Sequence, residues 1–192
     1  MNNLYIKAIN RAKELLLENP FDVYHTLDHH AEVVCNIFDI KDAEVIELKN
    51  GLLEVAAWWH DVFKDNTRGE ELLIKEFLDL GLNQEEIQEI LNIISSHSFG
   101  QEQQNSEAKL LYDADKIALV SIPRWKYAFD RFDAGLISEA ERDKYIPEWN
   151  RRMPILEDKL HYKYSKLLFK KRYAEFVDWL KSIGRYQNGL MV

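Results

Sequence analysis

Apolar residues recur at helical spacing along most of this 192-residue chain. Near the N-terminus, Leu4, Ala8 and Leu15 fall on one side of a helix with 3.6 residues per turn. The same periodicity predicts helices over the ranges 3–18, 28–40, 42–50, 52–63, 70–80, 83–97, 106–122 and 164–183, with a further helix starting at Ser138. No segment alternates polar and apolar residues convincingly, so the pattern predicts an all-α fold.

Local signals indicate where several of these helices begin and end. Asn83 and Glu86 have the spacing of a capping box, and so do Ser138 and Glu141. Gly81 marks the end of the helix before the first pair, because glycine readily adopts the left-handed conformation that terminates many helices.

Three prolines predict interruptions in the C-terminal part of the chain. Proline lacks a backbone N–H and clashes with the preceding helical turn. We therefore expect Pro123 to interrupt the helix over 106–122, and Pro147 and Pro154 to kink or break the segment after Ser138.

Composition narrows the class of protein. A hydrophobic content of 46% and an aromatic content of 12% indicate a globular chain, and its length fits one domain. The net charge of −8 disfavours a nucleic-acid-binding or membrane-binding surface, while a local basic group can still meet a small phosphorylated substrate.

The expected compartment is the cytoplasm. No apolar run reaches membrane-spanning length, and the charged residues among the first seventeen are incompatible with a secretory signal. The single Cys35 cannot form an internal disulfide, which fits a reducing compartment, and we expect it in the core.

Five of the six histidines lie in short segments that also contain aspartate or serine. The four segments are His25-Thr26-Leu27-Asp28-His29-His30, His60-Asp61, Ser96-His97-Ser98 and Asp113-Ala114-Asp115. Histidine and aspartate are metal ligands and proton-transfer groups. The run from Leu52 to Phe63 is apolar apart from Glu54, His60 and Asp61, which predicts a buried helix. A buried His-Asp pair needs a partner, and a cation is the simplest one.

Asp113 and Asp115 are alternatives for the fourth segment. On a helical wheel, Asp115 falls within the apolar arc of this helix, whereas Asp113 falls outside it, beside Lys109 and Lys116. The arc consists of Ala108, Leu110, Leu111, Ala114, Ala118 and Leu119. A carboxylate on a buried stripe needs a partner, so the periodicity favours Asp115 for the site and a solvated position for Asp113.

Over about residues 20 to 120, these motifs resemble the HD-domain superfamily of metal-dependent phosphohydrolases. The resemblance implies a metal site formed by His29, His60, Asp61 and Asp115. It also implies that His25 is a proton donor, since the stretch from Tyr24 to Val33 is similar to that of cyclic-nucleotide phosphodiesterases and bacterial HD hydrolases. The implied architecture is a compact helical domain over 1–184, with a core over 20–120, a C-terminal helical extension over 121–184 and a loose tail over 185–192.

Three details refine this resemblance. Lys64 stands where guanosine-tetraphosphate hydrolases have the first residue of an acidic pair, which sets this chain apart from that chemistry. No histidine cluster follows His97, as the HD branches with two metals would require. His30 is an alternative to His29, but adjacent helical residues point about 100° apart, and the family spacing favours His29, with His30 at the surface or behind the ligands.

Two histidines and two aspartates on a tetrahedral ion would leave no position for water. An octahedral Mn²⁺, Fe²⁺, Co²⁺, Ni²⁺ or Mg²⁺ leaves room for water and a phosphoryl oxygen. We therefore expect hydrolysis of a nucleotide or another small phosphate ester. The expected proton acceptors are Asp61 and Asp65, the donor is His25, and the candidate substrate contacts are His97, Lys64, Arg68 and Lys116. The alternative is a non-catalytic metal-binding or nucleotide-sensing HD module.

Overall fold

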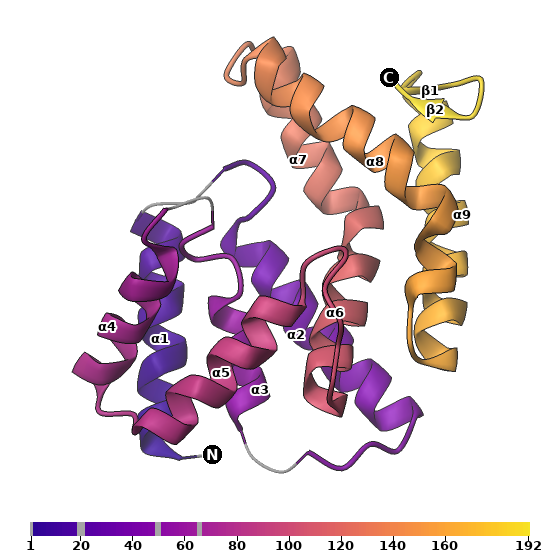
Figure 1. Ribbon diagram of the computed structural model, residues 1–192. Coiled ribbons are helices and arrows are strands. Elements are labelled where there is room, and N and C mark those ends of the chain that lie inside the picture. The colour runs from indigo at the N-terminus through magenta and orange to yellow at the C-terminus, as the bar shows by residue number, and fades with distance from the viewer. Residues whose placement is uncertain (1, 19–21, 49–50, 65–66) are drawn as a thin grey trace. The chain divides into compact units, whose positions relative to one another are not determined.

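The computed structural model describes residues 2–18, 22–48, 51–64 and 67–192 (Figure 1). Nearly all of its regular structure is helical, which confirms the all-α prediction. Its elements are α1 (Asn3–Glu18), α2 (Leu27–Ala43), α3 (Leu52–Trp59), α4 (Gly69–Leu80), α5 (Gln84–Ser96), α6 (Ser106–Ile117), the 3₁₀ turn η1 (Ala118–Val120), α7 (Ile122–Asp133), α8 (Glu139–Lys159), α9 (Lys163–Ser182), β1 (Tyr186–Gln187) and β2 (Leu190–Met191).

The chain divides into two compact units, Met1–Asp115 and Lys116–Val192. In the first unit α3 is the central helix, since it packs against α1, α2 and α5, while α4 packs against α1 and α5. Trp59 fixes one of these contacts, because its indole N–H donates to the backbone carbonyl of Ala8 at 3.0 Å. The expectation of one domain over residues 1–184 stays a prediction.

Helix α3 is buried along its whole length, as its apolar composition predicted. It ends at Trp59, however, and not at Phe63. The next backbone hydrogen bonds are tighter, from Val62 N to Trp59 O and from Lys64 N to Asp61 O. These i to i+3 bonds place His60 and Asp61 in a turn just beyond the helix.

The capping predictions for α5 and α8 are confirmed, because both capping boxes form. Gly81 follows α4 with φ of 92°, as a left-handed helix end requires. The predicted helix over 42–50 is wrong for its described residues. Helix α2 continues to Ala43, and Val45 then turns the chain with φ of 55°; residues 49 and 50 lie outside the described residues.

The prolines interrupt less than predicted. Pro123 lies in the first turn of α7, where its missing N–H is not needed, and the helix before it ends earlier, at Ile117. Helix α8 continues through Pro147 and Pro154, both of which are exposed. The opposite face of α8 is anchored by the buried side chains of Ile146, Trp149, Met153 and Leu156. Packing therefore outweighs the loss of two backbone hydrogen bonds.

The last eight residues form a hairpin where the sequence predicted a loose tail. Strands β1 and β2 pair antiparallel across Asn188 and Gly189, which have φ of 52° and 85°. Asn-Gly is the dipeptide that such two-residue hairpin turns prefer. Asn150 of α8 anchors the hairpin, since its side chain bonds both the N–H and the carbonyl of Met191, at 2.8 and 2.9 Å.

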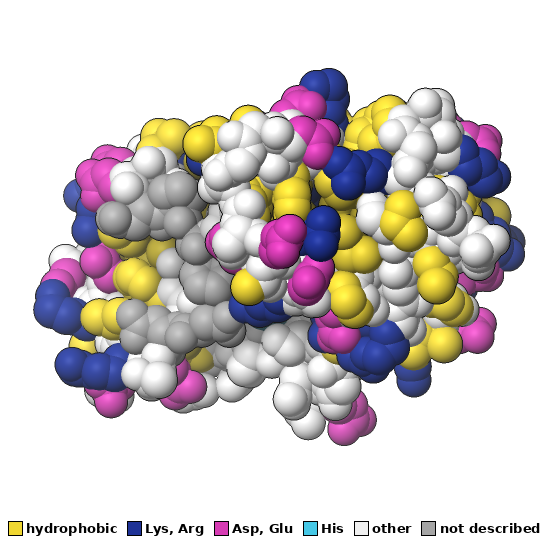
Figure 2. All heavy atoms as spheres, turned by 90° about the horizontal axis from the view of Figure 1, so that it is seen from above, with side chains coloured by type: hydrophobic (Ala, Val, Ile, Leu, Met, Phe, Trp, Pro, Cys, Tyr) yellow, Lys and Arg dark blue, Asp and Glu magenta, His cyan; other side chains and the backbone are white. Residues whose placement is uncertain are grey.

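The surface is mixed in character, with exposed hydrophobic side chains such as Leu17 and Val45 among the charged ones. Acidic and basic side chains intermingle over the face drawn in Figure 2. Cys35 lies at the surface, which corrects the expectation that it belongs to the core. Among the described residues, no helix combines the length and the apolar character that a membrane crossing requires.

Candidate metal centre

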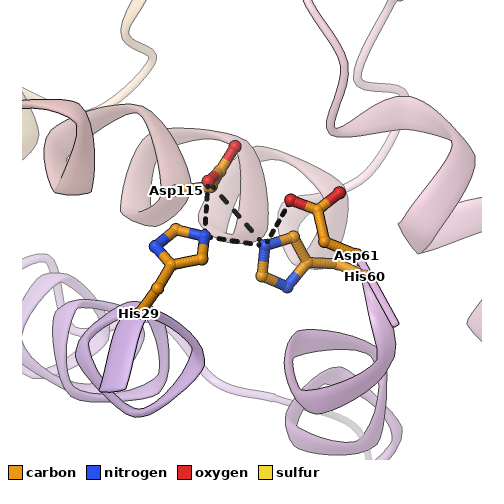
Figure 3. A group of neighbouring side chains, drawn as sticks. All are labelled: His29, His60, Asp61 and Asp115. Carbon is orange, nitrogen blue, oxygen red and sulfur yellow. Dashed lines mark hydrogen bonds and ion pairs between the residues drawn. The ribbon is translucent and has the colours of Figure 1, made fainter. Parts of the chain in front are cut away.

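Four side chains from three parts of the first unit meet at one point (Figure 3). His29 comes from the first turn of α2, His60 and Asp61 from the turn after α3, and Asp115 from α6. One nitrogen or oxygen atom of each lies within 4.8 Å of the others, and all four residues are buried. The structure thus brings together the four residues that the resemblance implied as metal ligands.

The two imidazoles direct their Nε2 atoms toward the centre of the cluster. The Nδ1 atom of His60 lies 2.7 Å from the carbonyl of Ala57, which assigns the ring proton to Nδ1 and leaves a lone pair on Nε2. That Nε2 lies 3.3 Å from Nε2 of His29 and 3.8 Å from Oδ1 of Asp115. Nε2 of His29 lies 3.4 Å from the same oxygen.

This donor set fits a divalent cation. Two carboxylates and two imidazole nitrogens face one another in a buried space, where carboxylate charges are costly unless a positive charge balances them. Nitrogen and oxygen donors together suit first-row divalent ions and Mg²⁺. His29, His60, Asp61 and Asp115 can therefore hold one ion.

Asp61 connects the cluster to a second group of polar residues. Its Oδ2 lies 3.5 Å from His60 Nε2 and accepts a hydrogen bond from the Lys64 ammonium at 2.9 Å. Its Oδ1 lies 3.4 Å from Nε2 of His97. Burial alone would raise the pKa of Asp61, but the positive charge of Lys64, with His60, His25 and His97, holds that pKa well below its usual range. Asp61 is therefore a carboxylate at ordinary pH.

His25 lies beside Asp61 and Lys64, at the edge of the cluster. Its Nε2 is 3.4 Å from Asp61 Oδ2 and 3.1 Å from Lys64 Nζ, while its Nδ1 is 2.8 Å from Asp22 Oδ1. The side chain of Lys64 is 36% exposed and that of His25 only 7%. A lysine side chain that is partly open to solvent therefore lies next to a buried imidazole.

His97 caps the C-terminal end of α5 and faces Asp61. Its Nδ1 bonds the carbonyl of Ile94, so the ring presents Nε2 to Asp61. His97 is buried, as a group in the site would be.

The other predicted site residues are placed differently. Arg68 is largely exposed and forms an ion pair with Glu71 at 2.7 Å. Lys116 is buried in α6, directly after Asp115. Asp65 lies outside the described residues. The roles of all three stay predictions.

One sequence expectation near the cluster is wrong. Asp113 is fully buried, not solvated, because α6 is covered on every side from Leu110 to Ala118. His30 was expected at the surface or behind the ligands, and its full burial fits the second of these positions. Its Nδ1 bonds the carbonyl of Thr26 at 2.9 Å. Burial, together with neighbouring His60, holds the pKa of His30 well below its usual range, so the ring is neutral. It packs against His60 with ring centroids 4.5 Å apart.

Sequence reasoning missed two residues that hold the site in place. Asp22 bonds His25, and Asn36 of α2 donates to the carbonyl of Ala114 at 3.0 Å, next to Asp115. The one available signal was for Asn36, a polar residue seven positions after His29 and hence on the same side of α2.

One protein-family model matches this chain. The model of the HD domain matches residues 21–119, which include the whole cluster. No match is found among curated proteins.

Several solved structures share the fold at low sequence identity. A protein from Lactobacillus plantarum has a TM-score of 0.74 and 18% identity, with 96% of each chain covered. A predicted HD superfamily hydrolase from an uncultured Thermotogales bacterium has a TM-score of 0.62 and 16% identity, over 93% of this chain and 90% of that one. Bacillus subtilis YpgQ, solved in complex with ADP, has a TM-score of 0.64 and 15% identity, over 97% of this chain and 98% of that one.

Proposed function

The chain belongs to the HD domain family, and from this premise we propose that it is a metal-dependent phosphohydrolase acting on a nucleotide or another small phosphate ester. The observation that carries the proposal is the buried cluster of two histidines and two aspartates beside a His25–Lys64 pair. A site that only bound metal would need neither His25 nor Lys64.

The proposed ligands of the ion are His29, His60, Asp61 and Asp115. The ion is one of Mn²⁺, Fe²⁺, Co²⁺, Ni²⁺ and Mg²⁺. When bound, it supplies a Lewis acid that lowers the pKa of a water molecule and offsets negative charge on the phosphoryl group. His60 holds its Nε2 lone pair in place through the bond from Nδ1 to Ala57, and Asp61 stays ionised without the ion.

The proposed proton donor is His25. Its Nε2 gives a proton to the leaving oxygen as the P–O bond breaks, and the bonding electron pair stays on that oxygen. The proton from the attacking water passes to Asp61 or Asp65. The position of His25 supports this role, because its Nε2 faces Asp61 Oδ2 at 3.4 Å without being one of the four clustered donors.

The proposed substrate contacts are Lys64 and His97, with Arg68 and Lys116 as further candidates. Lys64 is a partly exposed cation beside Asp61, so its ammonium group can bind a phosphoryl oxygen that approaches the site. YpgQ, which has the same fold, was solved in complex with ADP, and this supports a nucleotide as the substrate of the present protein.

A hydrolysis screen tests the proposal. Nucleotides, phosphate monoesters and phosphate diesters are offered to the purified protein with Mg²⁺, Mn²⁺, Co²⁺ or Ni²⁺, and its metal content is measured. We expect release of phosphate, pyrophosphate or alcohol that needs the metal. Saturable nucleotide binding without turnover in any metal would instead indicate the sensing module.

His25→Ala tests the proton donor within the same assay. General acid catalysis contributes about 10²- to 10⁴-fold, so turnover of a substrate with a poor leaving group should fall by about that factor while metal stays bound. Turnover of substrates with nitrophenolate as the leaving group should fall much less. His161→Ala, in an exposed histidine, is the control. Equal losses for good and poor leaving groups would exclude the acid role.

A further inference from the structure

The segment that leads into α2 contains a carboxylate with three close N–H donors. Oδ1 of Asp22 accepts hydrogen bonds from the backbone N–H of Tyr24 at 2.7 Å and of His25 at 2.9 Å. The same oxygen lies 2.8 Å from Nδ1 of His25. The two side chains are only 10% and 7% exposed, so water competes little for these bonds.

This arrangement determines which nitrogen of His25 carries the proton in the neutral ring. A carboxylate oxygen only accepts hydrogen bonds, so Nδ1 must donate to it. Nε2 then holds the lone pair and accepts from the Lys64 ammonium, 3.1 Å away. Nε2 is thus the nitrogen that faces Lys64 and Asp61.

We propose that Asp22 is a positioning residue for His25, fixing its ring orientation and its Nδ1–H tautomer so that Nε2 faces the leaving group. This inference rests on the acid role given to His25 above. With a proton on each nitrogen, the ring donates through Nε2 while Nδ1–H stays bonded to Asp22. After Nε2 has given up its proton, the neutral ring keeps the proton on Nδ1, which is the tautomer that Asp22 favours.

Asp22 also shapes the turn before α2, so a purely structural role has to be separated from action through His25. The turn precedes His29, and a distorted turn would weaken metal binding. Action through His25 would leave metal affinity unchanged. It would also make the effects of the Asp22 and His25 substitutions non-additive, because the second removes the group on which the first acts.

The variants follow from the hydrogen bonds. Asp22→Ala removes the acceptor. Asp22→Asn keeps an oxygen that the backbone N–H groups of Tyr24 and His25 hold in the same place, so the Nδ1–H tautomer should persist. Asp28→Ala is the matched control, because it removes an exposed carboxylate from the start of the same helix.

Kinetics with Mn²⁺-loaded protein give the first measurement. We expect Asp22→Ala to lower kcat for poor leaving groups by about tenfold or more, within the range of general acid catalysis, and to change nitrophenyl esters little. The KM and the Mn²⁺ affinity of Asp22→Ala should stay as in the wild type. The kcat of Asp22→Asn should fall far less than that of Asp22→Ala. The double variant with His25→Ala should be no slower than His25→Ala alone. A further loss in the double variant would overturn the proposal.

The tautomer is measured independently of turnover. The ¹⁵N spectrum of histidine-labelled, Mg²⁺-loaded protein near pH 8, with the His25 signal assigned through His25→Gln, should show the Nδ1–H form in the wild type. It should show a mixture in Asp22→Ala. An Nε2–H form in the wild type would contradict the inference even if the enzyme is active. The Nδ1–H form with no effect of His25→Ala on turnover would instead contradict the proposed acid role.

Discussion

Asp61 is the residue that joins the candidate metal centre to the groups proposed for catalysis. One of its oxygens lies near His60, His25 and Lys64, and the other lies near His97. Removal of the Asp61 side chain would therefore change the proposed metal site and also remove the ion pair with Lys64. Asp115 lies 3.4 Å from His29 and 3.8 Å from His60, the two histidines of the cluster. Asp115 is therefore a position at which metal binding can be tested.

Asp115→Asn should lower Mn²⁺ affinity by at least about tenfold, because it removes a negative charge from the donor set while keeping the shape of the side chain. Asp113→Asn should leave Mn²⁺ affinity intact. It should lower the free energy of unfolding by about 1 to 3 kcal/mol, since Asp113 is a fully buried polar group. Calorimetric titration and urea denaturation of both variants measure these effects. Loss of metal from Asp113→Asn with retention by Asp115→Asn would reverse the assignment.

The identities of the clustered residues were predictable from the sequence, but their surroundings were not. A His-Asp pair at the end of an apolar helix indicates a buried charge, whichever way the chain folds. The helical wheel correctly favoured Asp115 for the cluster, yet it wrongly placed Asp113 in solvent. A wheel compares the faces of one helix and cannot show that other elements cover all of them. Asp22 carries no sequence signal, because its role depends on a turn.

At the scale of elements, α2 helps to position both His29 and Asp115 in the candidate metal centre. It carries His29 in its first turn and Asn36 two turns later, and Asn36 bonds the α6 carbonyl next to Asp115. A hydrogen bond from α2 to α6 helps to fix the distance between His29 and Asp115. Such supporting contacts typically affect metal affinity about 10- to 100-fold.

Asn36→Leu should therefore weaken Mn²⁺ binding by about tenfold or more, although leucine has a similar size and the site is buried. Asn92→Leu, in an exposed asparagine of α5, serves as the control. Calorimetric titration compares the two variants. Unchanged affinity in Asn36→Leu would mean that packing alone positions Asp115.

Tyr5 joins α1 to the start of α5 by a 2.7 Å bond from its hydroxyl to Glu86. Burial and this bond raise the pKa of Tyr5 to about 12. The unfolded chain loses this proton near pH 10, so the stabilisation is present below pH 10 and is lost as the pH rises toward 12. Between these values, urea denaturation should show a smaller loss of stability in Tyr5→Phe than in the wild type. If the free energies of unfolding of the two proteins changed equally between pH 10 and pH 12, the raised pKa of Tyr5 would be contradicted.

Helix starts and stops that have a local capping signal were more predictable than breaks. Both capping boxes and Gly81 depend on interactions within a few residues, and they formed as expected. The persistence of α8 through two prolines depends on packing that is distant in sequence. The hairpin at the end of the chain did have a local signal, Asn188-Gly189, although its anchor on Asn150 could not be inferred from the sequence.

At the scale of the whole molecule, charge is unevenly distributed. Residues 1–115 contain 23 Asp and Glu against 9 Lys and Arg, whereas residues 116–192 contain 10 against 16. The unit that carries the cluster is therefore strongly acidic, which favours divalent cations and disfavours long polyanions. Many basic side chains of the second unit are paired, as in the contacts Lys126–Asp130, Lys170–Glu157 and Arg185–Asp133.

The protein should accordingly bind random-sequence duplex DNA or RNA no better than about micromolar at physiological salt, because its net charge of −8 offers little release of counterions. Fluorescence anisotropy at about 150 mM salt measures this. Tighter binding would indicate that residues 116–192 form a basic surface despite these ion pairs.

The central claim is that one divalent ion binds at His29, His60, Asp61 and Asp115. Calorimetric titration of chelator-treated protein with Mn²⁺ tests it most directly. We predict one site per chain in the wild type and in the exposed-histidine control His161→Ala, and no saturable binding in His60→Ala. Binding to His60→Ala with the affinity and stoichiometry of the wild type would contradict the account.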